Sequence, residues 1–481
     1  KLLAINFAGT AGSKCTEDMW ANDPVTRSEV SNLFQFKDFR SEIGYRAIMT
    51  PTVLSAFDEI HKRYCSMPWN ELVQPSIDIA KKGLTVSPNL DQYFQTGYAG
   101  GDKNNNPFQP NTYQRFTASE GSKSKYTKTD GSVYKLGELI NMSDYADTLS
   151  SIAKNGAREF YEGDLSKIII QDIEKNGGFV TEKDLKNYKP DFVEPLKINY
   201  LDYVISSPPP PNTGMSVLQM FKLIEPFQSE LKEHGSFDYL RILANAMSIA
   251  HQDRLDYNAD PKFVDIPVLE KILNEKYINS KIEDMKNNVI PNSGNTDKGS
   301  TTHVNVVDKQ GNWVGITHTL GWASGVITPG LGFMYNNGMN LADPRPGNLN
   351  SIAPGKARGS NMVPTVVLKN NKPVIICGAP GGAVIVSAVF QSILNSINYN
   401  MTPTESVSAP RIHTESGKVF LESRIRSDYK EKLIDLGFDV VQEQYPYNPM
   451  MARAQLVAIE EKTGELSGGS DPRGGGVVHK V

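Results

Sequence analysis

Two threonines in a predicted β-hairpin over residues 301–320 are the clearest candidates for catalytic residues. This segment reads TTHVNVVDKQGNWVGITHTL, and two alternating runs flank residues 309–311 (Lys-Gln-Gly). A three-residue loop with glycine at its third position is typical of a type I turn followed by a G1 bulge. Counting outward from this loop pairs Thr301 with Thr319, and opposite residues on one strand face have Cβ atoms about 5 Å apart. Two neighbouring hydroxyls can act as a nucleophile and its hydrogen-bond partner.

The two faces of this hairpin differ in polarity. Side chains alternate along a strand, so every second residue shares a face. Pairing of threonines is also common in half-buried hairpins, so the hairpin alone leaves a structural and a catalytic role open. The predicted apolar face holds Val304, Val306, Val314 and Ile316, and the mostly polar face holds Thr301, His303, Asn305, Thr317 and Thr319.

A second candidate element is the glycine pair Gly381-Gly382, at the end of the sequence GAPGG (378–382). The pair stands between a predicted strand over 373–377 and a predicted helix over 383–399. Backbone N–H groups at such a helix start can bind an anion or an oxyanion. A tight turn that needs positive φ also explains these glycines. Both interpretations stay open on the sequence alone.

The chain that must position these residues changes character near residue 300. Apolar residues at helical spacing predict mainly helices before this point, whereas the remainder is rich in glycine and strands. A polar stretch over 280–300 marks the change and predicts a division into regions 1–300 and 301–481. Residues 100–135 are polar and rich in breakers, which predicts a long surface loop or a mobile insertion. Other expected helices cover 47–64, 70–82, 143–155, 157–176, 213–226, 236–257 and 427–436, a helix N-cap is expected at Thr181, and further strands are expected within 192–206 and at 364–368 and 453–460.

The composition excludes several classes of protein. The 481 residues carry a net charge of −4, which argues against a nucleic-acid-binding protein because that function needs a basic surface. No apolar run is long enough to span a membrane. Three cysteines allow at most one disulfide, and the seven histidines are scattered, so no metal site is expected. The sequence contains no glycine-rich phosphate-binding motif, so nucleotide binding is not expected. Lys1 begins no signal-peptide pattern, and the compartment stays open.

Motifs spread over nearly the whole chain carry a family resemblance in both order and spacing. They are PPPPNTG (208–214), AHQDRLDYNADPKFVD (250–265), TTHVNVVDKQGN (301–312), NNGMNLADPRPGNLNSIAPGK (336–356), GSNMVPT (359–365), GAPGG (378–382), APRIH (409–413) and SDPR (470–473). With these motifs the chain resembles the γ-glutamyltranspeptidase family of N-terminal-nucleophile hydrolases. The resemblance implies an α+β fold, an αββα sandwich built from a large region (1–300) and a small region (301–481).

The resemblance also implies a mechanism. In the family the precursor cleaves itself before the first threonine of the TTH motif, here between Ser300 and Thr301. Thr301 would then attack an amide carbonyl and form an acyl-enzyme, with its own α-amine as the general base. Thr319 would hydrogen-bond the nucleophile, and the N–H groups of Gly381 and Gly382 would bind the oxyanion. No metal or organic cofactor is needed.

Partners follow from the same resemblance. The expected partners are a small-molecule amide or peptide substrate and the two fragments of one precursor, while a homo-oligomer is allowed and a nucleic acid is not expected. The substrate-binding residues implied are Ser360, Asn361 and Asp343.

The substrate clamp departs from the family pattern. Ala8 stands where the family has an arginine that binds the substrate α-carboxylate, and Gly321 and Gly338 replace polar residues. The acidic residue that meets the α-amine falls near Leu341, with Asp343 the nearest candidate. Arg358 or Arg345 could replace the missing arginine.

Three functions are therefore weighed. The first is a γ-glutamyltransferase or hydrolase acting on γ-glutamyl amides such as glutathione. The second is an acylase for a non-glutamyl amide, similar to a cephalosporin acylase. The third is a catalytically silent binding homologue. Retention of Thr301, Thr319 and the glycine pair favours an enzyme.

Overall fold

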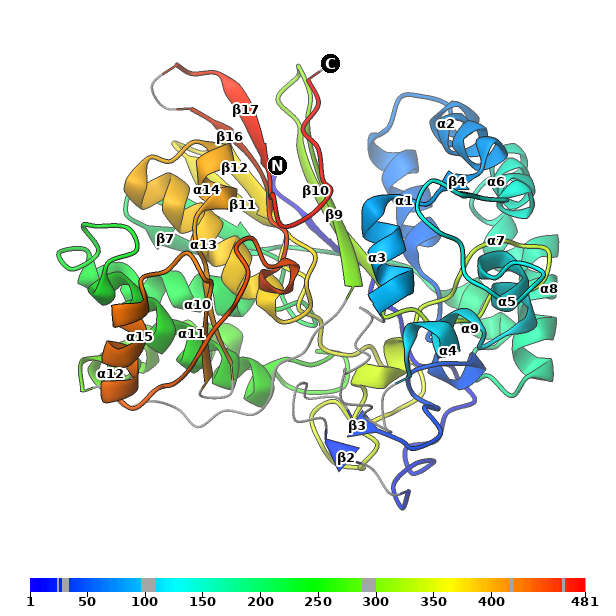
Figure 1. Cartoon of the computed structure of the whole chain (residues 1–481), viewed down its shortest axis with the longest axis horizontal. Helices are drawn as coiled ribbons and strands as arrows, with labels where there is room; N and C mark the ends of the chain where they lie inside the picture. Colours follow the sequence, from blue (N-terminus) through cyan, green and yellow to red (C-terminus); the bar gives the residue numbers. More distant parts are fainter. Residues whose placement is uncertain are drawn as a thin grey trace.

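A six-stranded antiparallel sheet organises the part of the molecule that carries the candidate nucleophile (Figure 1). In the computed structural model, which describes residues 1–23, 26–27, 34–96, 110–287, 300–415, 418–460 and 463–480, the strand order is β17-β16-β12-β11-β8-β7. Strands β7 and β8 come from region 1–300 and the other four from region 301–481, so the two regions share one sheet. The strands are β7 (Leu196–Tyr200), β8 (Tyr203–Ser207), β11 (Thr365–Lys369), β12 (Lys372–Gly378), β16 (Gln455–Ile459) and β17 (Leu466–Ser470).

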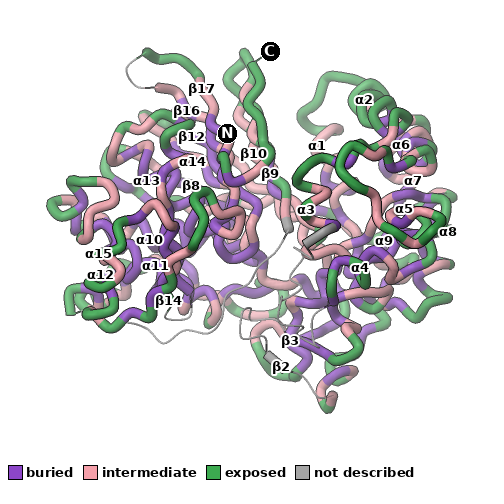
Figure 2. The backbone as a smooth tube through the Cα atoms, viewed as in Figure 1, coloured by how far each residue is buried: buried purple, intermediate pink, exposed green. Residues whose placement is uncertain are grey.

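A helical layer covers one face of this sheet. Its central helices are among the most buried segments of the chain (Figure 2). Phe221 and Phe390 meet edge to face at 4.9 Å within the apolar core, and burial of such side chains is the main stabilising term in folding. The helices are α10 (Gly214–Ile224), α11 (Phe237–Tyr257), α12 (Glu275–Lys286) and α13 (Val384–Tyr399).

The predicted hairpin forms a separate two-stranded sheet of β9 (Ser300–Val307) and β10 (Trp313–Gly321). It packs on β12 and β16, and this places helices, sheet and hairpin in successive layers. The hairpin turns its polar face inward, and the His303 ring lies against Gly378, where a Cβ atom would come within 2.1 Å of the ring. The valines of the apolar face point outward, and Val304 and Val306 are each about half exposed.

The remaining helices gather beside this assembly, at the right in Figure 1. Their own apolar core includes Ile169, Ile173 and Leu185, all fully buried. The helices are α1 (Val53–Tyr64), α2 (Trp69–Lys82), α3 (Pro88–Thr96), α4 (Thr112–Phe116), α5 (Glu120–Tyr126), α6 (Ser143–Asn155), α7 (Glu159–Glu162), α8 (Asp164–Lys175) and α9 (Glu182–Asn187).

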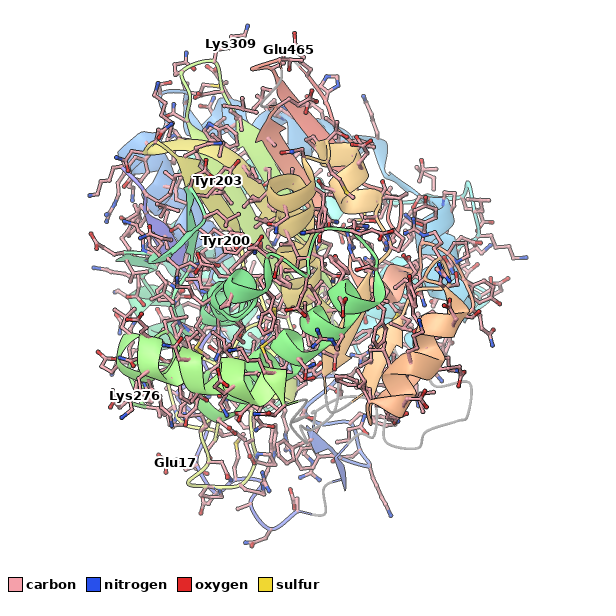
Figure 3. The ribbon with its side chains drawn as sticks, turned by 90° about the vertical axis from the view of Figure 1, so that its left-hand side faces the viewer. Glu17, Tyr200, Tyr203, Lys276, Lys309 and Glu465 are labelled. Carbon is pink, nitrogen blue, oxygen red and sulfur yellow. The ribbon has the colours of Figure 1, made fainter. Side chains whose placement is uncertain are left out.

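Short elements complete the described chain. The strands are β1 (Ala4–Asn6) with β6 (Asp191–Val193), β2 (Thr26–Arg27) with β3 (Phe34–Gln35), β4 (Leu84–Thr85) with β5 (Leu139–Ile140), and β13 (Ile412–Glu415), β14 (Lys418–Leu421) and β15 (Asp439–Gln442) in a three-stranded sheet. The short helices are η1 (Tyr45–Ala47), η2 (Glu225–Phe227), η3 (Val268–Ile272), η4 (Gly338–Leu341), η5 (Pro449–Met451), α14 (Pro403–Ser408) and α15 (Ser427–Asp435). Lys309 at the hairpin tip and Glu465 beside β17 project at the same end of the molecule (Figure 3).

Local structure confirms some sequence expectations and corrects others. Thr181 caps α9 and forms a reciprocal capping box with Asp184, as predicted. The loop predicted over 100–135 is wrong in its second part, because α4 and α5 form there, each opened by its own capping box. Its first part, up to residue 109, lies outside the described residues. In the polar stretch over 280–300, α12 continues to Lys286, and residues 288–299 again lie outside the described residues.

Two further findings bear on the class of protein. No helix among the described residues is long and apolar enough to cross a membrane. Within the described ranges, no group of three or more His, Cys, Asp or Glu side chains is arranged to hold a metal ion. Cys15, Cys65 and Cys377 are all free thiols.

Candidate active site

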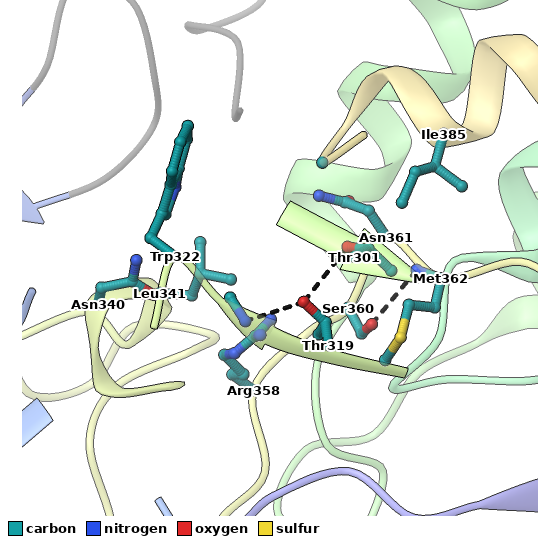
Figure 4. Close-up of a pocket in the computed structure, with 12 residues that line it drawn as sticks. Thr301, Thr319, Trp322, Asn340, Leu341, Arg358, Ser360, Asn361, Met362 and Ile385 are labelled. Carbon is teal, nitrogen blue, oxygen red and sulfur yellow. Dashed lines mark hydrogen bonds between the residues drawn. The ribbon is translucent and has the colours of Figure 1, made fainter. Parts of the chain in front are cut away.

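The hydroxyl groups of Thr301 and Thr319 meet at the base of the hairpin (Figure 4). Thr301 Oγ1 donates to Thr319 Oγ1 at 3.3 Å. The predicted register holds from Val307 opposite Trp313 to Thr302 opposite His318, after which it shifts by one residue. The shift allows the backbone N–H of Gly321, at φ +69°, to donate to Thr319 Oγ1 at 2.8 Å. Thr319 is therefore held by its own chain while it contacts Thr301.

Below the two threonines, the polar face of the hairpin is satisfied internally. His303 Nδ1 lies 2.7 Å from Thr317 Oγ1, and His303 Nε2 lies 2.8 Å from Asn305 Oδ1. Asn305 Nδ2 donates to the carbonyl of Gln455 in β16. Burial lowers the pKa of His303 to about 4, so the ring is neutral near pH 7. This network explains how a polar face can lie against the sheet without unpaired groups.

The glycine pair lies at the junction between β12 and α13. Gly382 lines the same pocket as Thr301, and Gly381 adopts φ +147°, where a Cβ atom would come within 2.6 Å of the Cβ of Ala452. Neither Gly381 nor Gly382 donates its N–H to an acceptor within the described part of the chain. Such N–H groups before a helix start are available to an anion or an oxyanion.

The pocket is open to solvent, and the space between its walls, with the open part included, is about 370 Å³. Its lining combines hydroxyl, amide and guanidinium groups with apolar side chains, and no Asp or Glu is among the lining residues. The chemistry offered to a ligand is therefore rich in hydrogen-bond donors. The lining residues are Thr301, Thr319, Gly321, Trp322, Asn340, Leu341, Arg358, Ser360, Asn361, Met362, Gly382 and Ile385.

Ser360 and Asn361 enter this pocket from a segment that is held from behind. The N–H of Ser360 donates to the Pro211 carbonyl at 2.7 Å, and its carbonyl accepts from the Thr213 hydroxyl. Asn258 Nδ2 donates to Pro211 as well, at 3.2 Å. The proline run that ends at Pro211 is largely buried, so it is neither an exposed linker nor a surface ligand. It supports the pocket wall.

Asp343, predicted to bind substrate, does not line the pocket. Its carboxylate accepts from Arg345 Nε and Nη2 at 3.0 and 2.7 Å, and this side chain is 10 % exposed. Arg345 is engaged in the same pair and also lies outside the lining. Arg358, the other arginine considered from the sequence, does line the pocket. The role of Asp343 in binding stays a prediction.

Sequence reasoning missed part of the wall. Trp322, Asn340, Met362 and Ile385 all line the pocket, and each follows closely on a motif residue already singled out. Their positions were readable, but for Trp322 the backbone is held through a network that reaches region 1–300. The N–H of Trp322 donates to Asn337 Oδ1, and Asn337 Nδ2 donates to the carbonyl of Glu42. The Glu42 carboxylate in turn accepts from Arg115 Nη2 at 2.8 Å.

The layered α+β fold, with two threonine hydroxyls meeting in a pocket at the start of a strand, is that of the N-terminal-nucleophile hydrolases. A sequence model of the family described as Gamma-glutamyltranspeptidase matches residues 1–481. The chain therefore belongs to the γ-glutamyltranspeptidase family, whose members are hydrolases or acyltransferases acting on amides.

Relatives carry two kinds of name. The chain is 30% identical to the glutathione hydrolase proenzyme of Escherichia coli (strain K12), over 98% of this chain and 80% of that protein. It is 31% identical to the acylase ACY 1 proenzyme of Pseudomonas sp. (strain V22), over 97% of this chain and 80% of that protein. The two names stand at nearly equal identity, so sequence similarity does not choose between them.

Solved structures share the fold. The cephalosporin acylase from Bacillus halodurans matches with a TM-score of 0.82 at 24% identity, over 98% of this chain and 83% of that one. The γ-glutamyltranspeptidase from Helicobacter pylori matches with a TM-score of 0.51 at 26% identity, over 59% of this chain and 75% of that one. These likenesses confirm the predicted fold class.

Proposed function

We propose that Thr301 is the nucleophile of an amide acyltransferase or hydrolase, exposed when the chain cleaves itself between Ser300 and Thr301. The observation that carries this proposal is the Thr301–Thr319 hydroxyl pair in a pocket that also contains Gly382. A nucleophile, an orienting hydroxyl and oxyanion donors around one cavity are the parts that amide acyl transfer requires.

Self-cleavage uses the same atoms. Thr301 Oγ1 attacks the carbonyl carbon of Ser300, the C–N bond breaks, and the proton of the hydroxyl ends on the released nitrogen. The product is an ester between Ser300 and the Thr301 side chain. Water then hydrolyses the ester and leaves Ser300 as a carboxylate and Thr301 with a free α-amine. An α-amine has an ordinary pKa near 8, so a useful fraction is unprotonated near neutral pH.

Turnover repeats this chemistry on a substrate amide. The α-amine accepts the Thr301 proton as Oγ1 attacks the carbonyl, and the N–H groups of Gly381 and Gly382 stabilise the oxyanion. The proton then passes to the leaving amine, and an acyl-enzyme remains on Oγ1. Water releases the acid, whereas an amino acid or peptide amine takes the acyl group in transpeptidation. No step calls for a metal or organic cofactor.

Two substrate classes are candidates for this site. γ-Glutamyl amides such as glutathione carry an α-ammonium group, which needs a carboxylate partner. Among the described residues no carboxylate lines the pocket, and the nearest candidate, Asp343, is paired with Arg345. Leu341 and Gly321 instead line the wall where the family has polar groups. These observations favour the second candidate, an acylase for a non-glutamyl amide, with Arg358 as the cation that meets a substrate carboxylate.

The two fragments would stay together after cleavage. Strand β8 of region 1–300 pairs with β11 of region 301–481 along residues 203–206 and 366–369. The buried Arg115–Glu42 ion pair is linked to Asn337 across the same boundary. Breaking such contacts would expose a large apolar core, so the cleaved enzyme is expected to remain one particle.

Gel electrophoresis with intact-mass analysis tests the proposal. Wild-type protein is expected to give two fragments, the second beginning at Thr301, and Thr301→Ala one full-length band. Thr301→Ser keeps a hydroxyl and is expected to cleave, which serves as the matched control. A fragment at the same bond in Thr301→Ala would overturn self-cleavage by Thr301. If wild-type protein stays uncleaved and forms no acyl adduct with the amides tested, the result would favour the third function, a catalytically silent binding homologue.

A further inference from the structure

Arg254, near the end of helix α11, lies outside the lining of the pocket but contacts its wall through Asn361. The side chain of Arg254 is 9 % exposed, and its Nη1 donates to Asn361 Oδ1 at 2.6 Å. Its Nη2 forms an ion pair with Glu415, whose carboxylate is fully buried on β13. Arg254 thus joins a buried anion to a residue of the pocket wall.

This contact decides which end of the Asn361 amide faces the ligand. A carboxamide has one acceptor oxygen and one NH₂ donor, whereas a guanidinium offers donors only. If the amide were flipped, two donors would face each other. The guanidinium therefore holds Asn361 Oδ1 toward Arg254, and Nδ2 points away from Arg254. The Asn361 side chain lies beside Thr301 in the pocket (Figure 4).

Glu415 faces a buried histidine that contacts helix α13. Its Oε2 lies 3.5 Å from His413 Nε2, and His413 Nδ1 lies 2.8 Å from the hydroxyl of Ser387 in α13. All three of these side chains are nearly or fully buried. His413 thus connects the surroundings of Glu415 to α13, the helix that begins just after the glycine pair.

We propose that Arg254 is a positioning residue for acyl-group recognition, acting only through Asn361. By fixing the amide, it makes the pocket favour acyl groups that carry a hydrogen-bond acceptor, such as a carboxylate or a carbonyl, where they meet Asn361. Arg358 supplies charge on the same wall, and Asn361 supplies a directed N–H. This inference rests on the proposed function, because it needs Thr301 to accept the acyl group.

A double-mutant cycle with paired substrates tests it. Glutaryl- and pentanoyl-p-nitroanilide have acyl chains of equal length and differ only in a terminal carboxylate against a methyl group. Arg254→Gln is expected to lower the ratio of the two kcat/KM values by about tenfold, the loss of one oriented, charge-assisted contact, and mainly through KM. Asn361→Ala is expected to lower it by a similar factor, and the double variant no further than Asn361→Ala alone. Arg254→Lys keeps a positive charge near Glu415 but lacks the planar set of donors of a guanidinium. Its ratio of kcat/KM values is expected to lie between those of wild type and Arg254→Gln.

Controls separate this role from support of the fold. Arg254→Gln leaves the Glu415 carboxylate buried without its cation, so the charge-balanced pair Arg254→Gln/Glu415→Gln provides a second variant. Arg241→Gln removes an arginine from the same helix, 13 residues away, and is expected to match wild type in the ratio.

Each outcome is informative. An equal loss on both substrates, or additive effects in the double variant, would overturn the positioning role. A wild type that cleaves itself but shows no preference between the substrates would also overturn it, while the chemistry of Thr301 stands. Failure of self-cleavage in wild type would instead count against the proposed function.

Discussion

The Oγ1 atoms of Thr301 and Thr319 lie 3.3 Å apart at the point where the register of the hairpin shifts by one residue. The shift lets the Gly321 N–H donate to Thr319, so the Thr319 hydroxyl is oriented from its own strand before it meets Thr301. A hydroxyl held in this way can direct the lone pairs of a neighbouring nucleophile. The relationship carries the first prediction.

Replacing Thr319 by valine should slow both reactions of Thr301. Valine keeps the β-branched shape, so the fold is expected to survive, although the Gly321 N–H loses its acceptor. Misorientation of the nucleophile should lower kcat by roughly 10- to 100-fold and slow self-cleavage. Gel electrophoresis of samples quenched at successive times measures the rate of self-cleavage, and steady-state kinetics measure kcat. Thr319→Ser, which keeps the hydroxyl, is the control, and rates for Thr319→Val within about twofold of wild type would show a structural pair only.

Alanine at Gly381 should remove the oxyanion site. The added Cβ would meet Ala452 within 2.6 Å, and φ +147° is unfavourable for any residue with a Cβ. The junction before α13 must shift, and loss of one oxyanion donor typically costs 10²- to 10³-fold in kcat. Kinetics with a chromogenic amide, beside a thermal melt, test this. Gly464→Ala, also at positive φ but in an open turn, provides a comparison for backbone strain alone. Similar kcat values for the two alanine variants would contradict the prediction.

Acid should destabilise the protein partly through His303. Burial lowers the pKa of this ring to about 4, below the ordinary 6.5, so the unfolded chain binds more protons between these values. The contribution of His303 to the free energy of unfolding is therefore fully present above about pH 6.5. It is lost as the pH falls toward 4 and amounts to about 3 kcal/mol.

Denaturant unfolding at several pH values measures the effect of His303. His303→Asn cannot titrate in this window, so its free energy of unfolding should depend less steeply on pH than that of wild type. Some slope should remain, because burial also lowers the pKa of His251. Equal slopes for wild type and variant would show that His303 does not contribute.

The altered pocket should handle γ-glutamyl substrates poorly. Ala8 stands where the family has an arginine, and Leu341 lines the wall. Asp343, the acidic residue considered for the α-ammonium group, is paired with Arg345. The missing contacts bind ground and transition states alike, so weak turnover of γ-glutamyl-p-nitroanilide should appear mainly as a high KM. Glutaryl-p-nitroanilide, which lacks the α-ammonium group, is the comparison substrate. A low micromolar KM for glutathione would contradict this view.

Local sequence was enough to predict the hairpin and most of its register. Gly311 adopts φ +80°, and the Asp308 N–H donates to the Asn312 carbonyl, as a three-residue loop with a terminal glycine requires. Turn type and alternation act between residues that are close in the chain, so they are readable there. The slip after His318 was not, because Asn337 helps to hold the Gly321–Trp322 segment from outside the hairpin.

By itself, then, the sequence determined the family, the predicted nucleophile and its hydroxyl partner, since residue types and short spacings specify them. Only the tertiary structure decided which hairpin face is buried and that Arg254 contacts Asn361 and Glu415. Arg254 and Asn361 are 107 residues apart, and Arg254 and Glu415 are 161 apart. Contacts at such separations depend on how α11 and β13 pack together, and no local pattern records that packing.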